Sequence, residues 1–222
     1  MILVDRFVDP GLCENWANAL ENAEFESGSK TAGWLARTAK DNEQLPRNTL
    51  FKEIQEHVQR QVFSNGAVNR FARPAKMGPM RVSRYVPGMS YGNHNDDPLM
   101  QGPMGIIRTD ISFTLFLAPP GTYEGGTLRI HNAGEIKEVK LEAGQAVFYP
   151  SGALHEVTEI TQGQRLAVVG WIESRLSDPR QREILGDLEA TRANIFEKHG
   201  ANEDVLLLSK SIANLMRLWA TS

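Results

Sequence analysis

Two side chains that can bind a metal ion stand two residues apart near the middle of the chain, His94 and Asp96. On a β-strand, residues i and i+2 point to the same face, so this spacing places the two side chains on one side, with backbones about 7 Å apart. An imidazole and a carboxylate in that arrangement can occupy adjacent positions on one metal ion. The His-x-Asp pattern is common by chance, so a metal site requires a third ligand.

His155 is the candidate for that third ligand. It follows the Pro150-Ser151-Gly152 turn and begins a segment with the apolar alternation of a strand. If the sheets form a jelly roll, strands far apart in sequence become neighbours, and His155 can approach His94 and Asp96. Two histidines and one carboxylate on one face of a metal leave the other positions open, which suits Fe(II) that activates oxygen. The alternative is a strand histidine that only makes hydrogen bonds in the core or at a sheet edge.

Arg165 lies ten residues after His155, at the start of the last predicted strand. If residues 161–163 form a three-residue hairpin loop, Arg165 lies opposite Glu159 and shares a face with His155, about 13 Å along the strand. Its planar guanidinium could then bind the far carboxylate of a five-carbon dicarboxylate that chelates the metal. The alternative is a surface arginine paired with Glu159, and a four-residue loop would turn Arg165 to the other face.

The elements that must position these residues are short strands. Segments of alternating apolar and polar residues, separated by glycine, proline and asparagine turns, predict strands at 81–86, 110–117, 126–131, 135–141, 145–149, 155–160 and 165–172. Short strands at this regular spacing favour an antiparallel jelly roll over about 76–174. Residues 97–107 contain two prolines and two glycines, which predict an irregular loop; it is either a lid over the site or a surface connection.

Helices flank the predicted strands on both sides. Apolar residues at helical spacing predict helices after Asp9 and over 48–63, and two more between 178 and 219 that form an αα-hairpin. The apolar stripes of this C-terminal hairpin must be buried either on the barrel or against a second subunit, and we favour a homodimer.

Composition excludes several classes of protein. The 222 residues include 24 basic and 27 acidic side chains, with a net charge of −3, so no excess of positive charge indicates nucleic acid or an anionic membrane as a partner. The single cysteine, Cys13, excludes an internal disulfide and fits a reducing compartment. No signal peptide or membrane span is evident, and we expect a cytoplasmic protein.

The motifs taken together resemble a known family. They are Arg84-Tyr85-x-x-Gly88-x-x-Tyr91-x-x-His94-x-Asp96, Arg108-Thr109-Asp110 with Thr114-Leu115-Phe116-Leu117, Tyr123-x-Gly125-Gly126, and Tyr149-Pro150-Ser151 leading to His155 and Arg165. Over nearly the whole chain this order is similar to the Fe(II)/2-oxoglutarate dioxygenases, and among them to the bacterial PKHD-type hydroxylases of the prolyl-4-hydroxylase-like branch. One departure is that Asn95 and Asp97 flank Asp96, where a valine-like residue and an asparagine are expected.

The resemblance implies a fold and a reaction. It implies a double-stranded β-helix within a dioxygenase domain over 1–175, followed by a helical appendage over 176–222. It implies that His94, Asp96 and His155 bind Fe(II) and that Arg165 binds 2-oxoglutarate. Tyr85 is either a second 2-oxoglutarate contact or a barrel-wall aromatic. The implied reaction couples oxidative decarboxylation of 2-oxoglutarate by O2, giving succinate, to hydroxylation of a C–H bond, with L-ascorbate as an activator.

The substrate and two rival functions stay open. A peptidyl proline is the substrate by analogy, but a fold does not specify a substrate, and a small amino acid or another protein side chain is the alternative. One rival is a cupin-like metalloprotein, although cupins favour a His-x-His start that this chain lacks, and the other is a non-catalytic jelly-roll binding module.

Overall fold

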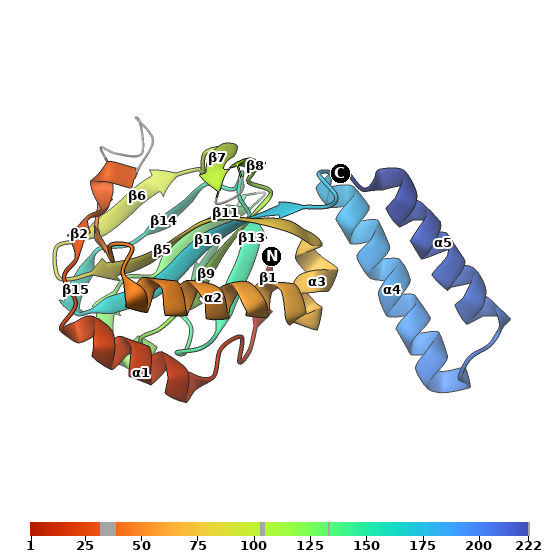
Figure 1. The fold of residues 1–222 in the computed structure, drawn as a ribbon, viewed down its shortest axis with the longest axis horizontal. Coiled ribbons are helices and arrows are strands. Elements are labelled where there is room, and N and C mark those ends of the chain that lie inside the picture. The colour runs from red at the N-terminus through yellow and green to blue at the C-terminus, as the bar shows by residue number, and fades with distance from the viewer. Residues whose placement is uncertain (32–38, 103–104, 133, 222) are drawn as a thin grey trace.

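The computed structural model describes residues 1–31, 39–102, 105–132 and 134–221, whose strands form two facing antiparallel β-sheets (Figure 1). The larger sheet contains, in spatial order, β1 (Ile2–Val4), β13 (Ala146–Pro150), β9 (Ile111–Phe116), β16 (Arg165–Ser174), β5 (Pro74–Tyr85), β4 (Glu43–Gln44) and β2 (Glu26–Ser27). The smaller sheet contains β12 (Glu135–Val139), β11 (Leu128–Asn132), β14 (His155–Val157), β6 (Ser90–His94) and β3 (Lys40–Asp41). This arrangement is the predicted jelly roll.

Two pairs of short strands stand outside these sheets. They are β10 (Tyr123–Gly125) with β15 (Ile160–Gly163), and β7 (Leu99–Gly102) with β8 (Gly105–Arg108). Short 3-10 turns, η1 (Gly28–Thr31) and η3 (Pro120–Thr122), precede β3 and β10.

Three helices cover the outer face of the larger sheet (Figure 1). They are α1 (Pro10–Glu21), α2 (Thr49–Ser64) and α3 (Gly66–Ala72). The side chain of Asp9 accepts a hydrogen bond from the Leu12 amide, and that of Asn48 accepts one from the Phe51 amide, so each satisfies a free donor at a helix start. The apolar stripes predicted for α1 and α2 are buried in the main core. The sequence analysis did not predict α3.

The C-terminal hairpin projects from the side of the barrel next to α3 (Figure 1). It consists of α4 (Pro179–His199) and α5 (Glu203–Trp219), as the sequence predicted. A separate small cluster of Leu176, Leu185 and Ile212 joins the hairpin, and Arg73 forms an ion pair of 2.7 Å with Glu189 that ties α4 to the body. None of the helices in the described part of the chain is both long and apolar enough to cross a membrane.

Two expectations about local structure were wrong. The segment 155–160 is not one strand, because β14 ends at Val157 in the smaller sheet and β15 pairs with β10. Residues 161–163 therefore belong to a strand rather than a hairpin loop, and Arg165 does not lie opposite Glu159. The segment 97–107, expected to be irregular, contains the β7–β8 hairpin, and its residues 103–104 lie outside the described part.

Candidate active site

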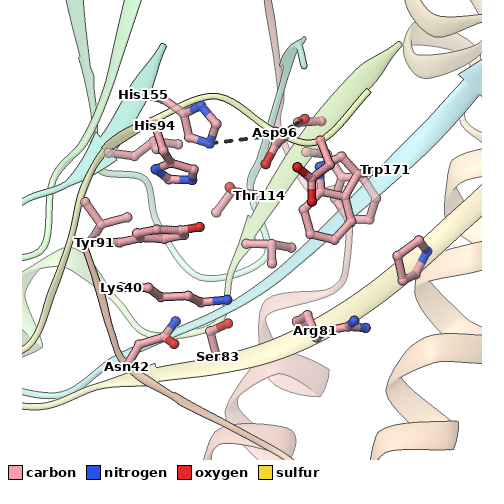
Figure 2. A pocket seen from close by; sticks show the side chains of 18 of the residues that line it. Lys40, Asn42, Arg81, Ser83, Tyr91, His94, Asp96, Thr114, His155 and Trp171 are labelled. Carbon is pink, nitrogen blue, oxygen red and sulfur yellow. Dashed lines mark hydrogen bonds and ion pairs between the residues drawn. The ribbon is translucent and has the colours of Figure 1, made fainter. Parts of the chain in front are cut away.

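His94, Asp96 and His155 meet at one end of the smaller sheet. Strand β14 pairs with β6 so that His155 lies directly opposite His94, and Asp96 follows β6 by two residues. One ligand atom from each residue, a ring nitrogen or a carboxylate oxygen, lies within 4.8 Å of the other two. His155 Nε2 stands 3.8 Å from Asp96 Oδ2, and Figure 2 shows the three side chains converging on one side of a cavity. The structure thus brings together the three residues selected from the sequence.

Backbone carbonyls orient both imidazoles. His94 Nδ1 lies 2.8 Å from the Gly92 carbonyl, and His155 Nδ1 lies 2.9 Å from that of Ala153. Because a carbonyl oxygen only accepts, each Nδ1 carries the proton and each Nε2 keeps a lone pair for a metal. Burial and, next, the neighbouring His155 together lower the pKa of His94 to about 4, so this ring is neutral at pH 7.

Two serines hold the Asp96 carboxylate. The Ser112 hydroxyl on β9 donates to Asp96 Oδ2 at 2.5 Å, and the Ser151 hydroxyl is hydrogen-bonded to Ser112 at 2.8 Å. Both serines are buried. The neighbouring Asp97 is exposed, so the three-residue cluster contains Asp96 and not Asp97. The sequence analysis did not identify Ser112 or Ser151; the inward parity of Ser112 on its strand was the available signal.

Arg165 is buried at the other end of the cavity. It opens β16 directly opposite Tyr85 on β5, is 1% exposed, and stands with its guanidinium carbon 5.3 Å from the Tyr85 ring centroid. Its Nε has no hydrogen-bond partner, and no carboxylate among the described residues forms an ion pair with it. Burying a cation without an opposite charge beside it is costly, so this position calls for an anionic ligand. Burial also raises the pKa of Tyr85, whose protonated hydroxyl can donate to the same ligand.

The cavity between the two sheets has a volume of about 320 Å³ and is open to the triad (Figure 2). Lys40 lines it with its ammonium 5.2 Å from the Tyr91 ring centroid, and burial lowers the pKa of this lysine to about 8. Leu99 and Met100 of the β7–β8 hairpin complete the rim. The Lys40-Asp41-Asn42-x-Gln44-Leu45 segment is part of the family resemblance, but the sequence analysis assigned Lys40 no role at the site.

The chain is similar in sequence to known oxygenases and hydroxylases. The model of the 2OG-Fe(II) oxygenase superfamily matches residues 80–173. The chain is 42% identical to a PKHD-type hydroxylase of Picosynechococcus sp. over 98% of both chains, and 41% identical to one of Synechococcus elongatus over 99% of both.

Solved structures share the fold at lower sequence identity. A prolyl-4-hydroxylase of Pseudomonas putida superposes with a TM-score of 0.57 at 20% identity, over 78% of this chain and 91% of that one. A prolyl hydroxylase of Trichoplax adhaerens, solved with a peptide fragment of a hypoxia inducible factor, superposes with a TM-score of 0.57 at 15% identity, over 82% of this chain and 86% of that one.

Proposed function

Because the chain belongs to the PKHD-type hydroxylases of the 2OG-Fe(II) oxygenase superfamily, we propose that His94, Asp96 and His155 bind its Fe(II) and that Arg165, with Tyr85, binds 2-oxoglutarate. The protein is an Fe(II)- and 2-oxoglutarate-dependent hydroxylase that uses O2. The observation that carries the residue assignment is the convergence of the three ligand atoms within 4.8 Å in a cavity that also contains the buried, unpaired Arg165.

The residues of the site fit both Fe(II) and 2-oxoglutarate. Two imidazole nitrogens and one carboxylate oxygen are a donor set that Fe(II) accepts while positions stay open for other ligands. The hydrogen bonds from the Nδ1 atoms to backbone carbonyls are the outer contacts that orient metal-bound histidines. Arg165 presents a planar fork that matches a carboxylate in two parallel hydrogen bonds.

The side chains of the site contribute to the reaction by holding the metal ligands and the co-substrate in place. When bound, Fe(II) and 2-oxoglutarate supply the oxidation, in which 2-oxoglutarate loses CO2 to give succinate and the substrate C–H bond receives one oxygen atom of O2. Ser112 fixes one oxygen of Asp96, and Arg165 with Tyr85 fixes the far end of the co-substrate.

The two rival functions lose support. The relatives that match over the full length are named hydroxylases, and the buried Arg165 would have no role in a cupin-like protein that needs no 2-oxoglutarate. A binding module without catalysis would not require open metal positions beside that arginine.

The test of the function is oxygen-dependent succinate release. We expect the Fe(II)-loaded enzyme to convert 2-oxoglutarate to succinate slowly without a substrate, and not at all without O2 or after metal removal by a chelator. We propose that L-ascorbate raises the total succinate formed, because a reductant returns oxidised iron to Fe(II). Succinate formation that continues unchanged in the chelated protein would contradict the proposal.

The proposed substrate is a peptidyl proline. Support comes from two proteins of similar fold, a prolyl-4-hydroxylase and a prolyl hydroxylase solved with a peptide. A panel of proline peptides and small metabolites, scored for faster 2-oxoglutarate turnover and for a product 16 mass units heavier, tests it.

We propose that the chain has two units, the dioxygenase domain 1–175 and the helical appendage 176–222, and that the appendage forms a homodimer. Exposed leucines support this: Leu206 is 67% exposed and Leu218 is 76% exposed on α5. We expect sedimentation as a dimer at micromolar concentration. The double variant Leu206→Glu/Leu218→Glu should be a monomer, while Thr191→Glu on the exposed side of α4 should stay dimeric. A monomeric wild-type chain would contradict the proposal.

The proposed location is the cytoplasm. Support comes from Cys13, the single cysteine, which is buried and free, and burial raises its pKa to about 12. A thiol this basic is a packing residue rather than a nucleophile.

A further inference from the structure

One wall of the cavity is formed by β5 and β16. A second arginine, Arg81, lies on this wall at the end opposite to Arg165. Alternate residues of β5, from Tyr85 through Ser83 to Arg81 and Pro79, line the cavity beside the cavity-facing residues of β16. The register pairs Tyr85 with Arg165 and Arg81 with Val169, so the two arginines are separated by four residues, about 13 Å along the strands. A co-substrate bound at the Arg165 end leaves the Arg81 end for the molecule that is hydroxylated.

Trp171 lies at the same end of this wall as Arg81. It is the next cavity-lining residue of β16 after Gly170, at a bulge in the pairing with β5. Figure 2 shows Trp171 and Arg81 on the side of the cavity away from Tyr91 and His94. The Trp171 Nε1 atom is buried without a hydrogen-bond partner. An indole N–H can only donate, so the ligand that satisfies it must present an acceptor.

Arg81 differs in its partners from three other half-buried arginines. Arg73, Arg84 and Arg108 each pair with a carboxylate, at 2.7, 2.6 and 2.7 Å. Arg81 donates from Nη1 to the Met80 carbonyl at 2.8 Å, and no carboxylate among the described residues forms an ion pair with it. Burial lowers the pKa of Arg81, and the nearby Arg47 lowers it further, so positive charge gathers at this rim.

These observations identify the chemistry of the missing partner. A guanidinium with free donors beside a free indole N–H is complementary to a group that has a negative charge and only accepts hydrogen bonds. Asp97, another carboxylate of the lining, is exposed and forms no ion pair with Arg81. The partner must therefore come from outside the described chain.

We propose that Arg81 and Trp171 form a substrate subsite that binds a carboxylate, so the hydroxylated substrate is an acidic molecule. The inference rests on the proposed function and specifies its substrate class. The carboxylate belongs either to an acidic side chain beside the hydroxylated residue of a peptide or to a free carboxyl terminus.

Two matched pairs of probes separate these sources. N-acetyl-proline and N-acetyl-prolinamide differ only in a terminal carboxylate. The amidated dipeptides N-acetyl-Pro-Glu and N-acetyl-Pro-Gln differ only in a side-chain carboxylate. Binding is measured by calorimetry to the anaerobic enzyme loaded with Fe(II) and 2-oxoglutarate, in which no turnover occurs. In at least one pair we expect the acid to bind about tenfold more tightly than the amide, the effect of one charged hydrogen bond.

Three variants test Arg81 and Trp171, and a fourth is the control. Arg81→Gln should remove the preference for the acid, and Arg81→Glu should reverse it in favour of N-acetyl-Pro-Lys amide. Trp171→Phe, which keeps the ring and loses the N–H, should reduce the preference without removing it. Arg84→Gln on the same strand, whose side chain pairs with Glu43 instead of lining the cavity, should keep the full preference.

Several outcomes would overturn the subsite. They are equal affinity for acid and amide in both pairs, undetectable binding of both acids at millimolar concentration, or a preference that survives in Arg81→Gln. Iron content and 2-oxoglutarate affinity of Arg81→Gln should match those of the wild type, and a large loss of 2-oxoglutarate binding would assign Arg81 to the co-substrate instead. If the wild type itself fails to bind iron or 2-oxoglutarate, the proposed function fails, and this result is distinct from a missing acid preference.

Discussion

Replacement of His94 or His155 by alanine abolishes stoichiometric Fe(II) binding while the chain stays folded. Each variant loses one of three converging ligand atoms, and the two that remain cannot enclose the metal on one face. Iron per chain, measured anaerobically after removal of free metal, should fall from about one to near zero in both variants.

His199→Ala is the matched control, because this histidine is exposed at the end of α4, far along the chain from the triad. It should bind iron like the wild type. Thermal unfolding of the metal-free proteins reports whether the fold persists. Wild-type iron content in His94→Ala or His155→Ala, with normal unfolding, would remove that residue from the metal site.

Replacement of Arg165 weakens 2-oxoglutarate binding by about 30-fold to several thousand-fold, which corresponds to the roughly 2–5 kcal/mol lost when one partner of a buried charge pair is truncated. Arg165→Met is the informative variant, because it keeps most of the side-chain length in a site that is 1% exposed. Arg165→Lys should recover only part of the affinity, since an ammonium cannot make two parallel hydrogen bonds to one carboxylate.

Iron binding and stability separate this loss from unfolding. Both Arg165 variants should bind iron normally, because the arginine is not among the converging ligands. Without 2-oxoglutarate, Arg165→Met should be at least as stable as the wild type, because it removes a buried charge that has no carboxylate partner. Arg129→Gln, at an arginine whose side chain is 40% exposed, is the control. Unchanged 2-oxoglutarate affinity in Arg165→Met would leave the arginine without a role in binding.

Local patterns in the sequence determined the elements and the parity of the metal pair. Asp9, Asn48, Asp178 and Asn202 each cap the helix that the apolar stripes predicted, because capping depends on contacts within one turn. The two-residue spacing of His94 and Asp96 predicted that they would lie together, and they do, although β6 ends at His94 and Asp96 lies just beyond the strand. The resemblance of the ordered motifs then indicated the family.

Only the tertiary structure decided which strands pair and in what register. His155 lies opposite His94 through the β14–β6 pairing, across a separation of sixty-one residues that no local signal determines. Arg165 was expected opposite Glu159 and instead lies opposite Tyr85, because β16 pairs with β5 and β9 inside the larger sheet. Ser112, Trp171 and Arg81 become parts of one cavity for the same reason. Long-range register is set by the packing of both sheets at once, whereas sequence periodicity records only which face of its own strand each side chain occupies.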